Sequence, residues 1–464
     1  MATQTLTKLP PLWPHQEEAI NFVDGKPAAM LAMVMRSGKS RVTVQLLEQR
    51  KAKRVLILCP ASVVDVWPGQ FREFASENYV IAALRGGTVD KRTSEAKKLL
   101  DNPNIQGMKV VVINYEACWR KVFADWAMKQ DWDVLILDES HRLKSPGGVA
   151  SRFVARLAAK IPFRLALTGT PMPHNPLDIY AQYRILDKTI FGTQFAYLQG
   201  RYMVRTMSKA GFPMDIGCRV DPKDKKYFSQ ELYDEFQEKF YRIAYRVGPE
   251  VLNLPDPLHI DRYCTLSPAG KRVYAELEKD FYAEVEQGTV SASNALVKSL
   301  RLHQVTSGYV KISETGAEAE VDDSKRKLLA DILEDIDEPV IVFCRFRYDL
   351  DNVHRVAQML TKSSLELSGR KNDLLDWQAG KAPILAVQIQ AGGVGIDLSR
   401  AGVAIYYSLG LSLGDHEQSL SRLLKRSMGS AAVYYYLVAE GTIDVKIARA
   451  LRERKDVIEA ILKR

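Results

Sequence analysis

Cysteine is scarce in this chain: five of its 464 residues are cysteines, and no two of them form a C-x-x-C pair. This spacing excludes a zinc ribbon and a disulfide framework. The sequence also lacks any run of about 18 consecutive apolar residues, the length that a membrane-spanning helix needs. Its polar beginning, MATQTLTKLPP, has no apolar segment typical of a signal peptide. We therefore expect a soluble, intracellular protein that does not associate with membranes.

The composition is that of a globular protein with a surplus of basic residues. Hydrophobic residues make up 46% of the chain and charged residues 26%, as is ordinary for folded soluble proteins. The formal net charge is +9, which favours a polyanionic partner. The surplus lies in residues 1–190 and 325–464, whereas the segment between them is slightly acidic. If a polyanion binds, we expect it to bind the parts of the protein formed by residues 1–190 and 325–464.

Short apolar runs alternate with helical patterns at both ends of the chain. Continuous apolar runs are typical of parallel strands that are covered on both faces. Their alternation with helices, such as those expected at 40–50 and 150–160, predicts an α/β fold with open, doubly wound sheets. The predicted strands are 28–33, 55–59, 110–114, 134–137 and 165–168, and then 340–344, 364–367, 384–388, 403–407 and 433–437.

The middle of the chain has a polar, helical pattern instead. We predict an N-terminal α/β domain over 1–190, a helical connector over 191–324, and a C-terminal α/β domain over 325–464. The last domain should end in a basic helix over 445–464. The acidic stretch at 312–324 is interpreted as an exposed loop.

A candidate phosphate-binding loop follows the first predicted strand. The run LAMVMRSGKS at 31–40 leads from an apolar strand into a helix, and the backbone N–H groups of such a helix can hold phosphate oxygens. Lys39 would reach the phosphates and the Ser40 hydroxyl would bind Mg²⁺. Arg36, Ser37 and Gly38 complete the loop, but Met33 stands where a first glycine is usual. Taken alone, G-K-S is equally compatible with a chance turn.

Two adjacent carboxylates end the strand predicted at 134–137. Asp138 is the candidate metal ligand, and Glu139 is the candidate base that orients the attacking water. His141 would couple the nucleotide to the next strand, where Thr168 begins the turn T-G-T-P. The alternatives are solvated acids at a strand end, a packed structural histidine and a plain strand turn.

The order of these motifs resembles helicase superfamily two, and its Swi/Snf branch in particular. The residues that carry this resemblance are HQ at 15–16, GKS at 38–40, CPASVVDVW at 59–67, INYE at 113–116, DESH at 138–141, TGTP at 168–171, LHQVTSGYV at 302–310, VIVFCRF at 341–347, LSG at 367–369, QAGGVGIDLSRA at 390–401 and HEQSLSRLLKR at 416–426. They cover nearly the whole chain.

The resemblance implies two RecA-like domains that bind one ATP, with Mg²⁺, and move along a nucleic-acid backbone. Gln16 would read the adenine, and Gly395 and Asp397 would approach the nucleotide from the second domain. Arg422 and Arg426 are the candidate arginine fingers.

The chain departs from the family's pattern at two places. Met33 and Val34 replace an acidic pair, and Arg36 replaces a glycine. The final motif also has irregular spacing, since Arg422 and Arg426 are four residues apart, where the family usually has two arginines three apart.

The resemblance also implies a nucleic-acid face that contacts phosphates regardless of sequence. An aromatic residue near a strand end more often packs in the hydrophobic core than stacks on a base, so a core position is the alternative for Trp67. The candidates are Ser62, Trp67, Asn114, Lys144, Thr168, Arg345 and Gly369.

We expect a monomeric, DNA-stimulated ATPase that translocates on double-stranded or branched DNA. The alternatives are a strand-separating helicase and a nucleotide-gated DNA-binding module that hydrolyses ATP weakly. Compact chains of this kind are typical of bacteria and phages, so we expect the cytoplasm of a bacterial or phage-infected cell. The sequence does not identify a recruiting protein.

Overall fold

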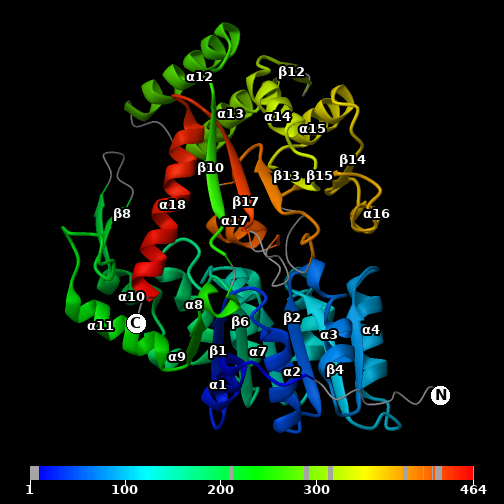
Figure 1. Cartoon of the computed structure of the whole chain (residues 1–464). Coiled ribbons are helices and arrows are strands. Elements are labelled where there is room, and N and C mark those ends of the chain that lie inside the picture. The colour runs from blue at the N-terminus through cyan, green and yellow to red at the C-terminus, as the bar shows by residue number, and fades with distance from the viewer. Residues whose placement is uncertain are drawn as a thin grey trace. The chain divides into compact units, whose positions relative to one another are not determined.

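The computed structural model describes residues 10–207, 213–253, 255–286, 292–311, 317–389, 396–410, 412–420, 422–423 and 431–462. The chain divides into two compact units. The first comprises residues 1–205, 215–252 and 457–464, and the second comprises 206–214 and 253–456. Each unit is built on its own sheet (Figure 1). In the described part of the chain, no helix has both the length and the apolarity to cross a membrane.

The first unit contains a seven-stranded parallel sheet in the order β3-β4-β2-β5-β6-β1-β9. All five strands predicted for this part of the chain are present, and β3 and β9 are additional. The order places β5, β6 and β1 side by side. The strands are β1 (Ala28–Met33), β2 (Arg54–Cys59), β3 (Tyr79–Leu84), β4 (Met108–Asn114), β5 (Val134–Asp138), β6 (Phe163–Thr168) and β9 (Ala244–Val247).

Helices connect these strands and bury their apolar faces against the sheet. In α7, for example, Phe153, Val154, Leu157 and Ala158 join the core with residues of β1, β2, β5 and β6. Burial of each valine- or leucine-sized side chain contributes about 1.5–3 kcal/mol. The helices are α1 (Pro14–Val23), α2 (Lys39–Gln49), α3 (Trp67–Phe74), α4 (Val89–Leu100), α5 (Tyr115–Cys118), α6 (Lys121–Ala127), α7 (Val149–Ala158), α8 (Ile179–Leu186), α9 (Lys188–Phe191), α10 (Phe195–Tyr202) and α11 (Gln230–Tyr241), with short 3₁₀ turns at Ala61–Val63, Ser140–Leu143, Pro176–Asp178 and Pro249–Leu252.

The second unit contains a six-stranded parallel sheet in the order β10-β17-β16-β13-β15-β14. All five strands predicted for this part of the chain are confirmed. β10 is additional, and pairs with β17 at one edge. The strands are β10 (Leu258–Cys264), β13 (Val340–Cys344), β14 (Ser364–Leu367), β15 (Ile384–Gln388), β16 (Val403–Tyr406) and β17 (Val433–Ala439).

Successive side chains of these strands point to opposite faces, and helices cover both faces. Ile341 and Phe343 pack with α17 and α18, whereas Val340 and Val342 pack with α14 and α15. The predicted doubly wound α/β class is therefore confirmed. The helices are α12 (Pro268–Glu286), α13 (Ala292–Thr306), α14 (Ser324–Glu334), α15 (Arg347–Met359), α16 (Leu374–Gln378), α17 (Leu413–Leu420) and α18 (Ile443–Leu462).

The predicted connector differs from a purely helical segment. It supplies β9 to the first sheet and β10 to the second, and its β7 (Met203–Met207) and β8 (Pro213–Cys218) form a separate two-stranded sheet. The stretch interpreted as a loop includes β12 (Glu318–Glu320), which pairs with β11 (Tyr309–Lys311). Local patterns missed these strands because their partners are distant or their side chains are polar. The boundaries at 190 and 324 stay predictions.

Candidate functional site

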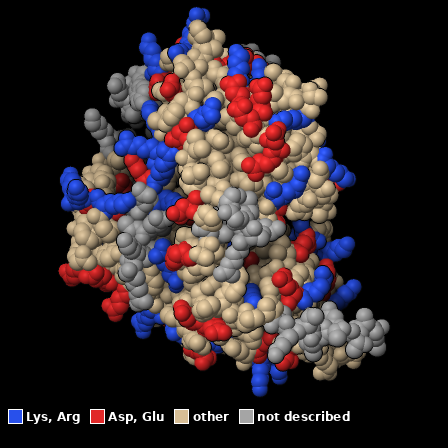
Figure 2. Space-filling model, viewed as in Figure 1, with Lys and Arg blue, Asp and Glu red and all other residues tan. Residues whose placement is uncertain are grey.

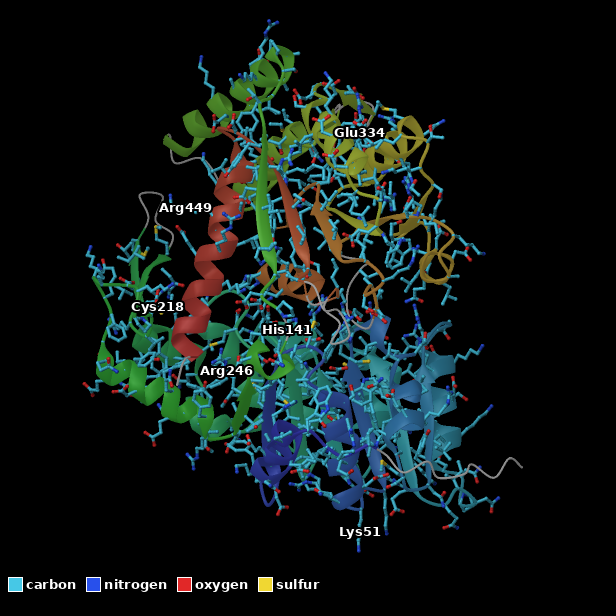
Figure 3. The ribbon with its side chains drawn as sticks, in the orientation of Figure 1. Lys51, His141, Cys218, Arg246, Glu334 and Arg449 are labelled. Carbon is cyan, nitrogen blue, oxygen red and sulfur yellow. The ribbon has the colours of Figure 1, made fainter. Side chains whose placement is uncertain are left out.

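The candidate site lies at the carboxyl edge of the first sheet, where β1, β5 and β6 end. The pairing register places Ala32 opposite Thr168 and Asp138 opposite Leu167. Because parallel strands end at the same edge, the loops that follow these three strands converge there. His141 follows β5 and Lys51 precedes β2, and the two residues lie at opposite ends of the unit (Figure 3).

The loop after β1 has a backbone that only glycine accommodates at its last position. Gly38 caps the N-terminus of α2 with φ 87°, in the left-handed region that favours glycine. A Cβ atom there would lie 2.1 Å from Gln16 Nε2, well inside van der Waals contact. Since α2 begins at Lys39, the free N–H groups of its first turn face this loop. The predicted phosphate loop therefore has the local structure that phosphate binding requires.

Helix α1 holds this loop through two side chains that meet at one carbonyl. His15 Nε2 lies 2.8 Å from the carbonyl oxygen of Ser37, and Gln16 Nε2 donates to the same oxygen at 3.0 Å. Gln16 Oε1 in turn accepts a hydrogen bond from the backbone N–H of Trp13 at 3.0 Å. Gln16, predicted from the sequence to read adenine, is thus bonded directly to the phosphate loop. This contact of His15 is not evident from the sequence.

Lys39 folds back over its own loop. Its Nζ donates to the carbonyl oxygens of Met33 at 2.8 Å and Val34 at 3.2 Å. These two residues stand where the family usually has an acidic pair, and here they contribute backbone oxygens instead. The ammonium group is therefore held at the end of β1 by neutral acceptors. Arg36 is exposed with φ 65°, and Ser40 is half-buried in the first turn of α2.

Asp138 and Glu139 stand at the end of β5. The indole N–H of Trp67 donates to Asp138 Oδ2 at 3.1 Å, and the Tyr115 hydroxyl donates to the Asp138 carbonyl at 2.8 Å. Desolvation and the neighbouring Glu139 raise the pKa of Asp138 to about 7, against the opposing effects of Lys39 and Trp67. Glu139 is 3% exposed and has a left-handed backbone with φ 52°. Such strain in a buried carboxylate residue is common at functional sites.

His141 lies between Glu139 and the end of the next strand. His141 Nδ1 lies 3.1 Å from Thr168 Oγ1 and 3.4 Å from Glu139 Oε2. Burial lowers the pKa of His141 to about 3, so the imidazole is neutral and its contact with Glu139 is not an ion pair. Thr168 Oγ1 also accepts from the N–H of Thr170 at 3.1 Å. The geometry is that of a link between the carboxylates and the T-G-T-P turn.

The side chains of Trp67 and Thr168, both predicted to contact nucleic acid, are buried. Trp67 is 1% exposed and Thr168 is 0% exposed, so neither side chain faces solvent. Trp67 was missed as a partner of Asp138 because no local pattern shows which distant side chain an indole contacts. Ser62 is exposed and Lys144 half-buried near the same edge. Asn114 accepts from Arg92 Nη1 at 3.0 Å and donates to Glu116 at 2.6 Å.

The other predicted residues belong to the second unit. Arg345 Nη1 lies 2.7 Å from His303 Nδ1, so its guanidinium points into the protein. Gly369 is exposed after β14. Asp397 accepts from the N–H of Ser399 at 3.0 Å, and Arg422, 9% exposed, donates to the carbonyl of Ile396 at 3.3 Å. Gly395 and Arg426 lie outside the described residues.

Surface charge does not by itself locate a polyanion. On the face shown in Figure 2, lysines and arginines are interspersed with acidic residues. The basic surplus counted from the sequence is therefore not gathered into one uniform patch on this face.

The residues at the carboxyl edge fit a nucleoside triphosphate with a divalent cation. The left-handed Gly38 and the first turn of α2 suit phosphate oxygens, and Lys39 supplies a positive charge. The described residues contain no cluster of three or more His, Cys, Asp or Glu side chains that could hold a metal alone. Asp138 and Ser40 suit Mg²⁺, which usually takes one or two protein ligands together with substrate phosphates.

A phosphate loop beside a carboxylate pair on a parallel sheet defines a nucleotide-binding protein of the P-loop class. Two family models match the chain: the SNF2-related domain over residues 20–308 and the helicase conserved C-terminal domain over residues 324–426. The chain belongs to the SNF2-related family, which confirms the resemblance drawn from the motifs. Membership implies ATP use and ATP hydrolase activity.

Several known proteins are similar over most of this chain. Putative protein p41 of Acyrthosiphon pisum secondary endosymbiont phage 1 is 23% identical over 97% of both chains. The uncharacterized ATP-dependent helicase MG018 of Mycoplasma genitalium is 20% identical over 97% of this chain, but this chain spans only 42% of its length. The solved Sulfolobus solfataricus SWI2/SNF2 ATPase core in complex with dsDNA is 17% identical, with a TM-score of 0.44, over 99% of this chain and 95% of that one.

Proposed function

We propose that this protein is a motor that couples ATP hydrolysis to movement along double-stranded or branched DNA. The observation that carries the proposal is the meeting of a glycine-capped phosphate loop, a carboxylate pair and a hydrogen-bonded link to the next strand at one sheet edge. Membership of the SNF2-related family supports a motor over a static nucleotide-binding protein.

Each residue at the edge has a role that follows from its chemistry. Gly38 and the first turn of α2 would bind phosphate oxygens, and Lys39 would exchange the carbonyls of Met33 and Val34 for a stronger anionic partner. Asp138 and Ser40 would hold Mg²⁺, which when bound neutralises phosphate charge. Glu139 would orient a water molecule and accept its proton. His141 and Thr168 would transmit the change to the T-G-T-P turn.

The second unit would supply positive charge to the same reaction. Arg422 and Arg426 are the candidate arginines, and their role is to neutralise charge that develops on the transferred phosphoryl group. Gly395 and Asp397 are proposed to lie near the nucleotide because they belong to the motif QAGGVGIDLSRA at 390–401. These assignments come from sequence position and are tested by substitution.

Contact with DNA is proposed through phosphates and not through bases. Ser62 and Lys144 follow strands of the first sheet at its carboxyl edge, Asn114 is the last residue of β4, and Gly369 follows β14 of the second sheet. Hydroxyl, amide, ammonium and backbone N–H groups are the donors that usually contact phosphates. Arg345 would join them only after leaving His303.

A DNA-binding module with weak hydrolysis is the second candidate. The contact of Lys39 with the carbonyls of Met33 and Val34 favours it, because these contacts must break before the ammonium reaches a phosphate. The deciding experiment measures ATP turnover without nucleic acid and with single-stranded DNA, duplex DNA, forked DNA and RNA. A motor is stimulated by DNA, whereas the weak module binds DNA with unchanged turnover. Strand displacement on forked DNA then separates a helicase from a translocase.

A further inference from the structure

A groove on the first unit lies between α7 and α8, and none of the residues that line it has a role assigned above. Its volume is about 480 Å³, and it is lined by Val149, Arg152, Ala155 and Arg156 of α7 and by Arg184 of α8. We propose that this groove binds an acidic peptide segment of another protein, which places an apolar side chain between carboxylates.

The lining carries three positive charges and no acidic residue. Arg152 and Arg156 are exposed and four residues apart on one helix, a spacing at which like charges repel. Among the described residues, neither has an ion pair with a carboxylate. Arg156 lies in the last turn of α7, where the helix dipole favours a cation, but Arg152 lies one turn earlier and gains little from it. An anionic partner would convert this repulsion into attraction.

Arg184 is fixed in place before any partner binds. Its Nη2 donates to the carbonyl of Pro146 at 2.9 Å and to the hydroxyl of Ser151 at 3.0 Å, and its guanidinium lies 5.8 Å from the centre of the Tyr180 ring. Arg184 Nε is buried and has no hydrogen-bond partner in the described structure. A guanidinium held in this way loses little side-chain entropy when it pairs with a carboxylate.

Two apolar side chains line the groove together with the arginines, and they favour a peptide over a nucleic-acid backbone. Val149 is 50% exposed, and Ala155 is half-buried. A leucine or similar side chain would bury this apolar surface, whereas a phosphate backbone has no apolar group that could cover it.

The direction of α7 supports the same choice. The helix begins near the carboxyl edge after β5 and returns to the start of β6, rising about 1.5 Å per residue. Arg156, near the end of the helix, therefore lies farther than Val149 from the edge where DNA contacts are proposed.

Fluorescence anisotropy tests the proposal with the intact protein and a labelled peptide rich in glutamate with interspersed leucines. Two matched peptides carry lysine for glutamate or serine for leucine. The variant is Arg152→Glu with Arg156→Glu. The control is Lys51→Glu with Lys53→Glu, which makes the same change of charge at two exposed residues of this unit. Duplex DNA binding and circular dichroism of every variant are measured alongside.

We expect the glutamate–leucine peptide to bind, and both matched peptides to bind more weakly. Arg152→Glu/Arg156→Glu should weaken peptide binding about tenfold or more, because it places like charges against the peptide. The control pair should change peptide binding far less, and DNA binding should be kept by both. No binding of the first peptide to the native protein, equal losses in the two variants, or a parallel loss of DNA binding would overturn the proposal. The proposal does not depend on DNA translocation, since peptide binding is measured without DNA or ATP.

Discussion

At the scale of single residues, several side chains of the candidate site form hydrogen bonds with backbone carbonyl groups of the phosphate loop. One carbonyl, that of Ser37, receives two side chains of α1, and Lys39 is held by two further carbonyls of the loop. Glu139 keeps a left-handed backbone inside the protein. These contacts define the loop geometry before a nucleotide binds.

Glu139→Gln should retain nucleotide binding and lose hydrolysis, because an amide can hydrogen-bond a water molecule but cannot accept its proton. General-base catalysis contributes about 10²–10⁴-fold, so ATP turnover should fall by that factor. Turnover and the binding of a fluorescent ATP analogue are measured together. Glu116→Gln, a change outside the carboxylate pair, is the control. Turnover that survives Glu139→Gln would refute the assignment of the base.

Gly38→Ala should destabilise the loop by about 1–3 kcal/mol, because a Cβ strains the left-handed backbone and displaces Gln16 from Ser37. Urea unfolding and ATP-analogue binding measure the loss. The double variant Gly38→Ala/Gln16→Ala removes the clash and keeps the backbone strain, so the two losses should be less than additive. Full additivity would show that Gln16 does not contact position 38.

At the scale of elements, local patterns predicted every interior strand of the two sheets and one edge strand, β14, and missed the edge strands β3, β9 and β10. The runs at 340–344, 364–367 and 384–388 match β13, β14 and β15 residue for residue. β10 mixes polar and apolar residues and none of them is buried, so it does not resemble a buried parallel strand. Its partner β17 comes about 170 residues later, at Val433–Ala439, and no local pattern reports so distant a pairing.

The motifs of the candidate site could be found from spacing, but their contacts could not. G-K-S and D-E-S-H identify the loop and the carboxylates because strand ends of a parallel sheet meet at one edge. The hydrogen bond from Trp67 to Asp138 joins residues 71 apart and depends on how α3 packs. For the same reason, the burial of Trp67 and Thr168 is not evident from the sequence.

An ion pair between Arg201 of α10 and Glu235 of α11 makes the stability of the protein depend on pH. Hydrogen bonds from Arg201, together with Lys239 and Tyr202, lower the pKa of Glu235 from its ordinary 4.5 to about 2. The stability that this carboxylate contributes is therefore present above about pH 4.5 and is lost as the pH falls toward 2.

Glu235→Gln should lower the free energy of unfolding at pH 7, and the difference from the native protein should shrink as the solution is acidified. Urea unfolding across this range measures it. The control Glu231→Gln changes an exposed residue of the same helix and should show a small difference at every pH. A pH-independent effect of Glu235→Gln would show that packing, and not charge, is lost.

At the scale of the whole molecule, a motor that holds DNA by its phosphates should bind less tightly as salt rises. Each neutralised phosphate releases counterions, so the logarithm of the binding constant falls linearly with the logarithm of the salt concentration. Lys144→Ala should weaken binding to duplexes of different sequence by the same factor and should reduce this slope. An affinity that does not change with salt would contradict phosphate contacts.

The central claim is that DNA controls ATP hydrolysis at the carboxyl edge of the first sheet. The most direct measurement is the steady-state rate of ATP hydrolysis by the native protein with and without duplex DNA, with Lys39→Ala as the inactive reference. We expect the rate to rise with duplex DNA and to be abolished in the variant. An equal rate with and without DNA would contradict it.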